Sequence, residues 1–149
     1  MEYRKLPKGN ENISVLGLGM GGMENCPDEE ITATIKKAID NGINFFDMCC
    51  GAKNIFEPFG KAIKDNREKI YMQIHFGAVY GKNNEYAWSR DFNSIKSTVE
   101  WELKALNTNY IDFGFLHCID EYEDFDALSK NGTFDYVKKL KEDGVIHHL

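Results

Sequence analysis

Three residues that can carry protons each stand at or near the end of a short apolar run. Asp47 closes "INFFD", His75 is the penultimate residue of "KIYMQIHF", and His117 follows "YIDFGFL". Carboxyl and imidazole groups are common general acids and bases, and histidine titrates near neutral pH. A lone aspartate after a strand is also an ordinary turn residue, so the elements around these groups must decide whether they act together.

Four cysteines follow predicted strand ends and so are expected at the same edge as the histidines: Cys26, Cys49, Cys50 and Cys118. Cysteine and histidine together can bind zinc or an iron–sulfur cluster, and a thiolate beside a cationic histidine is reactive. The spacing matches no metal motif, because an adjacent pair such as Cys49-Cys50 rarely chelates one ion. We therefore interpret the cysteines as small packing residues in a reducing compartment and predict no metal site.

Apolar periodicity predicts the elements that would position these groups. Strands are expected at 13–19, 43–47, 69–76, 110–118 and 144–149, and helices at 28–40, 55–64, 91–107 and 125–141, the last broken at Asn131-Gly132. Strands that alternate with helices predict a parallel sheet with right-handed crossovers. An open doubly wound sheet and part of a (β/α)8 barrel both fit, and both bind ligands at the carboxyl ends of the strands.

The glycines in "GLGMGG" hint at a dinucleotide-binding loop, but "MENCPDEE" separates them from the next helix. A Rossmann glycine loop runs directly into its helix, so a flexible turn is the better interpretation.

Composition excludes several classes of protein. The chain has 149 residues, 42% of them apolar and 28% charged, with a net charge of −6. The negative charge argues against a nucleic-acid surface, and no apolar run is long enough for a signal peptide or a membrane span. We expect a single domain over residues 1–149 in the cytoplasm, with a small molecule as its ligand.

Four segments together resemble the aldo-keto reductases. "MEYRKLPKGNENISVLGLGMGG" resembles the opening β-hairpin and first barrel strand, and "AIDNGINFFD" the second strand with its catalytic aspartate. "SRDFNSIKSTVEWELKALNTNYIDFGFLH" resembles the third helix and fourth strand, which ends at the catalytic histidine, and "LKEDGVIHHL" the approach to the fifth strand. The resemblance covers about the first half of a family member and is similar to bacterial members, some of which carry a C-terminal iron–sulfur region.

The resemblance implies an α/β fold of the (β/α)8 TIM-barrel type, with about half a barrel present. It implies NADPH as the cofactor, a small-molecule carbonyl as the substrate, and Asp47 and His117 as two of four catalytic residues. It also places Met20, Gly21 and Asp47 at the cofactor. The family tyrosine would fall at Ala52 and the family lysine at His75.

Two of the four family roles are therefore unmatched. His75 could itself act as an acid near Asp47, and Tyr80 could move into the site, although a loop aromatic is the plainer interpretation of Tyr80. Two functions remain open: an NADPH-dependent oxidoreductase in a longer parent, or a non-catalytic half-barrel such as a pseudoenzyme, a gene fragment or an assembly module.

The end of the sequence suggests a barrel that stops in its fifth strand. On that expectation the isolated chain would not bind NADPH usefully, and it would self-associate through its open edges and inner face. We expect Phe46, Ile74 and Phe115 on that inner face.

Overall fold

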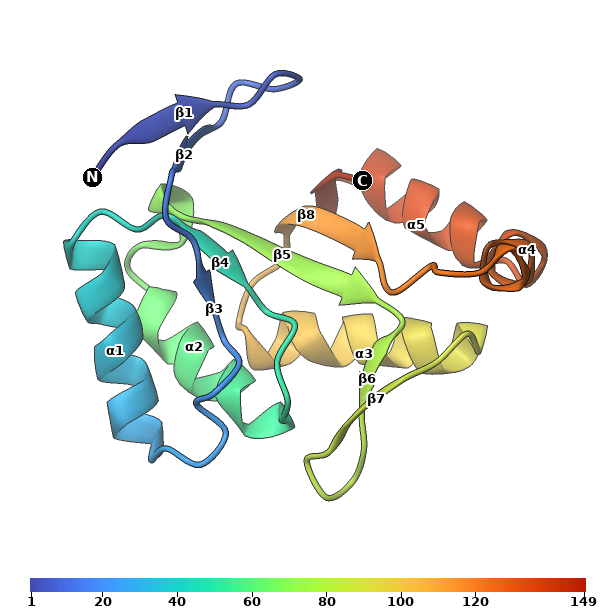
Figure 1. Ribbon diagram of the computed structural model, residues 1–149, viewed down its shortest axis with the longest axis horizontal. Coiled ribbons are helices and arrows are strands. Elements are labelled where there is room, and N and C mark those ends of the chain that lie inside the picture. Colours follow the sequence, from blue (N-terminus) through green and yellow to red (C-terminus); the bar gives the residue numbers. More distant parts are fainter.

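A computed structural model describes residues 1–149, and its centre is a sheet of parallel strands (Figure 1). Five strands follow one another in the order β3, β4, β5, β8 and β9, with β6 and β7 attached at one end of β5. Their bounds are Leu18–Gly19, Phe45–Asp47, Tyr71–Phe76, Ile111–Leu116 and Ile146–His148. Because spatial order follows chain order without reversal, the sheet is the beginning of a (β/α)8 barrel and not a doubly wound sheet.

Helices connect these strands: α1 (Asp28–Asp40), α2 (Phe56–Ile63), α3 (Phe92–Ala105), α4 (Tyr122–Lys130) and α5 (Thr133–Glu142). Figure 1 shows α1, α2 and α3 on one side of the sheet. Short 3-10 turns, η1 (Lys53–Ile55) and η2 (Arg67–Lys69), precede α2 and β5. None of the helices combines the length and the apolar character needed to cross a membrane.

Helix α1 forms where the sequence predicts it. Its first turn is acidic, which suits the positive end of the helix dipole, and Ile31 and Ile35 are fully buried on its inner face. The Asn41 side chain donates to the Lys37 carbonyl oxygen at 2.8 Å, and Gly42 follows with φ of 88°. A positive φ is accessible to glycine at little cost, so the chain turns here toward β4.

The strand predicted over residues 13–19 is divided in two. Its first part forms β2 (Asn12–Ser14), which pairs antiparallel with β1 (Tyr3–Lys5), and its second part is β3. The Asn44 amide accepts from the Ser14 N–H at 2.8 Å and donates to the Asn12 carbonyl at 2.9 Å. The opening hairpin is thus fastened to the start of β4.

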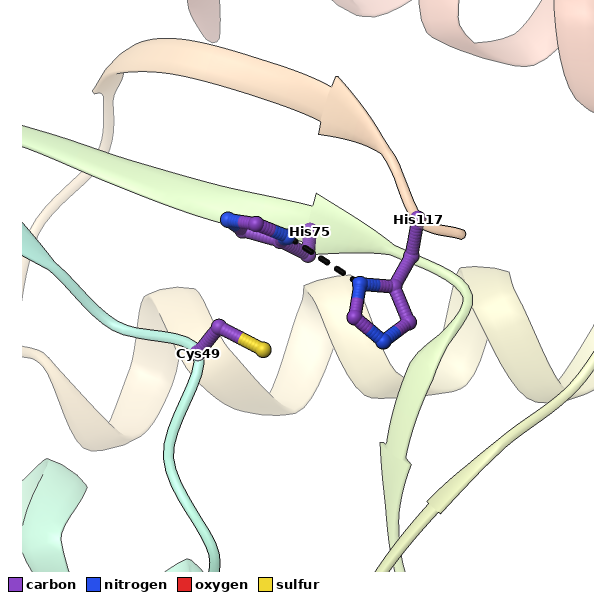
Figure 2. Close-up of side chains that lie close together, drawn as sticks. All are labelled: Cys49, His75 and His117. Carbon is purple, nitrogen blue, oxygen red and sulfur yellow. Dashed lines mark hydrogen bonds between the residues drawn. The ribbon is translucent and has the colours of Figure 1, made fainter. Parts of the chain in front are cut away.

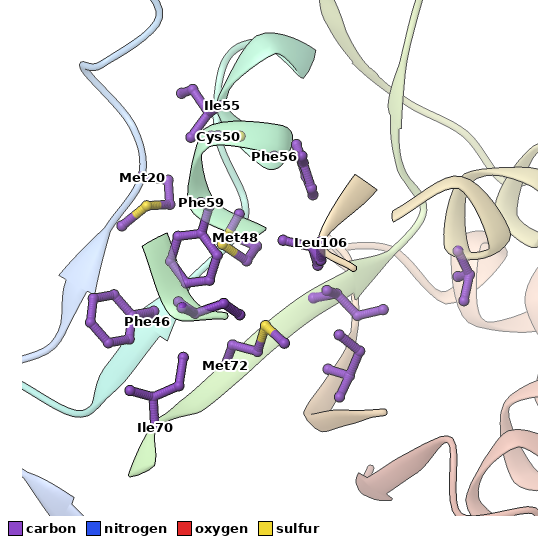
Figure 3. Packing of buried hydrophobic residues seen from close by; sticks show 14 of the residues in the cluster. Met20, Phe46, Met48, Cys50, Ile55, Phe56, Phe59, Ile70, Met72 and Leu106 are labelled. Atoms are coloured by element: carbon purple, nitrogen blue, oxygen red, sulfur yellow. The ribbon is translucent and has the colours of Figure 1, made fainter. Parts of the chain in front are cut away.

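Strand residues alternate between a helix-covered face and an inner face. Phe46, Met72 and Ile74 are completely buried against the helices, and the Phe46 ring meets the Phe59 ring of α2 at 5.4 Å (Figure 3). Each such aliphatic or aromatic side chain contributes about 1.5–3 kcal/mol by leaving water. The prediction that Phe46 and Ile74 face the barrel interior is wrong, because strand parity places them on the helix side; Phe115 does lie on the open face and is 47% exposed.

The amino ends of the strands are held by one buried ion pair. The Arg67 guanidinium lies 2.9 Å from Asp112 Oδ2 and also donates to the Tyr110 carbonyl at 2.9 Å. Asp112 Oδ2 accepts from the Met72 N–H at 3.0 Å. The pair therefore joins β5 to β8 at the edge of the sheet opposite to the carboxyl ends of the strands.

The segment after β5 is a hairpin and not the loop that the sequence predicts. Strand β6 (Ala78–Tyr80) pairs antiparallel with β7 (Tyr86–Trp88), and Gly77, with φ of 110°, makes the bend from β5. The hairpin projects beyond the carboxyl end of the sheet (Figure 1). The predicted break between the last two helices is confirmed at Gly132, where φ is 92°.

Candidate active site

The sheet brings Asp47, His75 and His117 together at its carboxyl edge. Asp47 is the last residue of β4, His75 is the fifth residue of β5, and His117 directly follows β8. The two strands that carry Asp47 and His75 are paired in register, and β5 pairs with β8. Cys49 reaches the same place from the loop after β4, as Figure 2 shows.

Asp47 binds two of its neighbours through one oxygen. Its Oδ1 atom lies 3.2 Å from His75 Nε2 and accepts from the Cys49 N–H at 2.9 Å. Burial alone would raise the pKa of Asp47, but hydrogen bonds from His75, the Cys49 N–H and Gln73 outweigh it and leave the pKa below its ordinary value. The carboxylate is therefore ionised at neutral pH.

The two histidines face each other through the same ring atom. Their Nδ1 atoms are 3.1 Å apart, and the Tyr86 hydroxyl forms a short hydrogen bond with His117 Nε2. One assignment of hydrogens satisfies all three contacts: Tyr86 donates to His117 Nε2, His117 Nδ1–H donates to His75 Nδ1, and His75 Nε2–H donates to Asp47. The four side chains then form one continuous hydrogen-bond chain.

His117 loses its proton more readily in this environment than a histidine does in water. Burial lowers the pKa of His117 most, and the neighbouring charges of His75 and Arg90 lower it further. Since two imidazolium ions cannot face each other at this separation, the pair holds at most one extra proton.

Tyr86 was missed by sequence analysis, and Tyr80 was considered in its place. Tyr80 is packed between Phe56 and Trp101, with ring centroids 5.0 and 5.8 Å away, and its hydroxyl contacts the Met48 carbonyl at 3.4 Å. Burial raises the pKa of Tyr80, so its hydroxyl stays neutral within the core. Tyr86 lies across the hairpin from Tyr80, and only recognition of that hairpin in "GAVYGKNNEYAW" could have revealed it.

The cysteines divide into two groups. Cys50 is buried in the hydrophobic core and Cys26 packs against it, in line with the packing role expected for them. Cys49 lies beside the two histidines, and Cys118 Sγ is 3.3 Å from His117 Nε2. Burial, followed by the charge of Asp47, raises the pKa of Cys49 to about 11, so it is a thiol in this environment.

Comparison with known proteins decides the family. A profile described as "Aldo/keto reductase family" matches residues 15–149. The chain belongs to the aldo/keto reductase family.

Relatives and solved structures agree with this membership. A curated relative, methylglyoxal reductase of Escherichia coli O157:H7, is 31% identical over 97% of this chain and 50% of its own length. A structure titled a putative aldo-keto reductase from Pseudomonas aeruginosa has a TM-score of 0.76 and 25% identity, covering 97% of this chain and 56% of that chain. An aldo/keto reductase from Klebsiella pneumoniae in complex with NADP and acetate has a TM-score of 0.60 and 20% identity, covering 93% and 45%. The chain spans about half the length of the curated relatives it matches.

Membership in the aldo/keto reductase family makes Ala52 informative. It occupies the position where resemblance implies the family tyrosine, yet its side chain carries no hydroxyl. Its backbone instead forms a β-bridge with Glu85, and the Tyr86 N–H donates to the Gly51 carbonyl at 3.3 Å. The β6–β7 hairpin is thereby fastened to the loop that carries Ala52, and Tyr86 comes to lie over the histidines.

The residues expected at a nicotinamide cofactor differ in how accessible they are. The Met20 side chain is buried in the core and its N–H donates to the Asp47 carbonyl at 3.0 Å. Gly21 is exposed, and a Cβ built there would meet nothing within 4 Å. The backbone at Gly21 is therefore open to a ligand and the Asp47 side chain is 36% exposed, so neither residue is closed to a nicotinamide group.

Proposed function

We propose that this chain forms the substrate side of an NADPH-dependent carbonyl reductase. The observation that supports this most is the hydrogen-bond chain from Tyr86 through His117 and His75 to Asp47, at the strand ends where barrel enzymes place catalytic groups. The methylglyoxal reductase among the relatives and the NADP in the Klebsiella pneumoniae structure favour the same activity.

The hydrogen-bond chain can supply the proton that carbonyl reduction consumes. With one extra proton on the histidine pair, two of the three bonds reverse: His75 Nδ1–H donates to His117 Nδ1, and His117 Nε2–H donates to the Tyr86 oxygen. His75 Nε2–H still donates to the ionised Asp47, and the Tyr86 hydroxyl is free to donate to a carbonyl oxygen. When Tyr86 gives up its proton, it takes one from His117, which takes one from His75. The chain then returns to its neutral direction, and a proton from water recharges it.

Each residue has a distinct part in this proposal. Tyr86 contacts the carbonyl oxygen and donates the proton, and burial raises the pKa of its hydroxyl, so Tyr86 remains protonated between turnovers. His117 and His75 carry the proton, and the ionised Asp47 stabilises positive charge on the pair. When bound, NADPH supplies the hydride; the backbone at Gly21 and Met20 and the side chain of Asp47 would hold its nicotinamide group.

The proposal is tested by carbonyl-dependent oxidation of NADPH in a longer protein that contains this chain; the 149-residue chain, which is expected not to bind NADPH usefully, is measured beside it. We expect small aldehydes such as methylglyoxal to be reduced, and His117→Gln and Tyr86→Phe to lower the rate. Tyr122→Phe is the matched control, since Tyr122 is 77% exposed on α4. If the protein binds NADPH but none of the carbonyl compounds causes it to be oxidised, the proposal is wrong.

A non-catalytic half-barrel is the second candidate, and Ala52 at the tyrosine position favours it. Ala52→Tyr discriminates between the two functions. If activity is absent and appears only when the tyrosine is restored, the natural chain is a pseudoenzyme; if the natural chain is already active, the Tyr86 route is supported.

Self-association and a cytoplasmic location also remain proposals. Phe115 and Leu149 are exposed, and they line an apolar groove of about 300 Å³ together with Leu116, Phe134 and Val137. We propose that a second copy covers this groove, because large apolar patches are unusual on soluble monomers. Light scattering that finds only a 17.1 kDa monomer would contradict this.

The four free cysteines support a reducing compartment.

A further inference from the structure

We propose that Cys49, His75 and His117 form a binding site for a divalent transition-metal ion of the zinc type, with a fourth coordination position left for water or another small ligand. The proposal goes beyond carbonyl reduction, because it concerns binding of the ion and not the reaction. Sequence analysis predicted no metal site, since the three residues come from three different strand ends and their spacing forms no motif.

The positions of the ligand atoms already approach those around a metal ion. One ligand atom from each residue lies within 4.8 Å of the other two, and the two imidazole Nδ1 atoms are 3.1 Å apart. In a tetrahedral zinc site with Zn–N bonds of about 2.05 Å, two nitrogen ligands are roughly 3.3 Å apart. The separation of the two imidazole nitrogens therefore already suits a tetrahedral ion, and adjustment of the side chains, Cys49 among them, would complete the set.

The outer contacts of all three residues match those that orient metal ligands. A histidine that binds a metal usually holds its other ring nitrogen against a carboxylate or another polar group. Here Asp47 holds His75 Nε2 at 3.2 Å, and the Tyr86 hydroxyl holds His117 Nε2. Asp47 also accepts from the Cys49 N–H at 2.9 Å, so one carboxylate positions two of the three ligand residues.

The ligand types select the class of ion. Two imidazoles and a thiolate suit zinc, cobalt and related ions, whereas magnesium and calcium require oxygen ligands. Cys49 must release its thiol proton to the solvent on binding, because the thiolate is the ligand. Three protein ligands leave a position for water or another small ligand, as in catalytic zinc sites.

The ion and the proposed proton relay exclude each other. In the free protein the space between the two Nδ1 atoms holds a single proton, and a metal ion would take its place. Bound metal therefore stops the transfer from His75 to His117, and we expect Zn²⁺ to inhibit any carbonyl reduction that uses this relay.

Titration of the metal-free protein with Co²⁺ tests the site without cofactor or carbonyl, so the result is independent of the proposed activity. We expect one Co²⁺ per chain, a thiolate-to-cobalt charge-transfer band, and displacement of cobalt by Zn²⁺. Cys49→Ser should abolish the band and His117→Gln should weaken binding at least tenfold. Asp47→Asn should weaken binding by about 10–100-fold, because it disturbs the orientation of the ligands.

Cys26→Ser is the matched control, because Cys26 is a free cysteine that belongs to the core and not to the ligand set. It should bind Co²⁺ like the natural protein. Circular dichroism of each variant separates loss of ligands from loss of fold, and His75→Gln offers a further ligand variant if one of the others unfolds. Absence of binding at micromolar Co²⁺, or an unchanged band in Cys49→Ser, would overturn the proposal.

Discussion

Two carboxylates lie at opposite edges of the same sheet, and they differ in burial and in their hydrogen-bond partners. Asp112, at the amino edge, is almost completely buried and is matched by Arg67 and the Met72 N–H. Asp47, at the carboxyl edge, is 36% exposed at its side chain, and its partners are His75 and the Cys49 N–H. A buried carboxylate paired with a guanidinium stabilises the fold, whereas a partly exposed one paired with a histidine can still take part in binding a ligand or moving a proton.

The largest expected effect comes from breaking the amino-edge pair. Arg67→Met leaves Asp112 charged and buried without its partner, so the free energy of unfolding should fall by about 3–5 kcal/mol. Urea denaturation measures it. Arg4→Met is the control, because the Arg4–Glu2 pair is exposed and worth no more than about 1 kcal/mol. Equal losses in the two variants would contradict the comparison.

The second effect concerns function at the carboxyl edge. Asp47→Asn keeps an oxygen for the Cys49 N–H but removes the negative charge beside His75. Turnover should fall about 100-fold, in the range that general acid–base groups supply, while the free energy of unfolding changes by less than about 1 kcal/mol. NADPH oxidation and urea denaturation of the same preparation give both numbers. A destabilised variant with full turnover would show that Asp47 is a structural residue.

A third carboxylate extends the comparison to a group with no cationic partner. Glu102 on α3 is 2% exposed, its Oε2 atom has no hydrogen-bond partner, and burial raises its pKa well above the ordinary 4.5. Because the folded-state pKa is the higher one, the contribution of Glu102 to stability is greatest below pH 4.5 and falls as the pH rises toward the folded-state value.

Glu102→Gln should therefore stabilise the protein by about 1–3 kcal/mol at pH 8 and have little effect near pH 4. Thermal unfolding at the two pH values measures the difference. Glu100→Gln on the same helix is exposed and should change stability by no more than about 0.5 kcal/mol at either pH. A gain that does not depend on pH would mean that folding does not raise the pKa of Glu102.

The last comparison separates two tyrosines of one hairpin. Tyr86→Phe should lower turnover about 100-fold, at the low end of proton-donor effects, and leave stability unchanged. Tyr80→Phe should do the reverse and cost about 0.5–1.5 kcal/mol of stability, because it removes a buried hydroxyl that contacts the Met48 carbonyl. Equal turnover in both variants would remove Tyr86 from the proposed relay.

Much of the fold was predictable because local signals and burial agree. The acidic start of α1, its isoleucines and its Asn41-Gly42 end all indicated one helix, and the helix forms there. The alternation of β5 was also readable, but which parity faces the helices depends on packing between distant segments. For that reason Phe46 and Ile74 were placed on the wrong face.

The site was only partly predictable. Asp47, His75 and His117 could be found because each lies at a strand end, and parallel strands present their carboxyl ends at one edge. Cys49 could be placed at the same edge for that reason, although no metal site was predicted there. Tyr86 could not be found, since its approach depends on a hairpin whose turn lacks an Asn-Gly or Asp-Gly signal. Its turn instead uses Asn84 with φ of 70°, which asparagine tolerates better than most residues.

The turn of the β6–β7 hairpin can vary separately from the barrel strands. The hairpin is fastened by backbone contacts to the loop of Gly51 and Lys53, and it presents Tyr86 from β7, whose three residues are all exposed. Insertions or deletions in its turn can therefore move Tyr86 while the sheet and its covering helices are inherited unchanged. A lineage in which Ala52 replaced the family tyrosine would thus have had a second aromatic hydroxyl, that of Tyr86, beside His117.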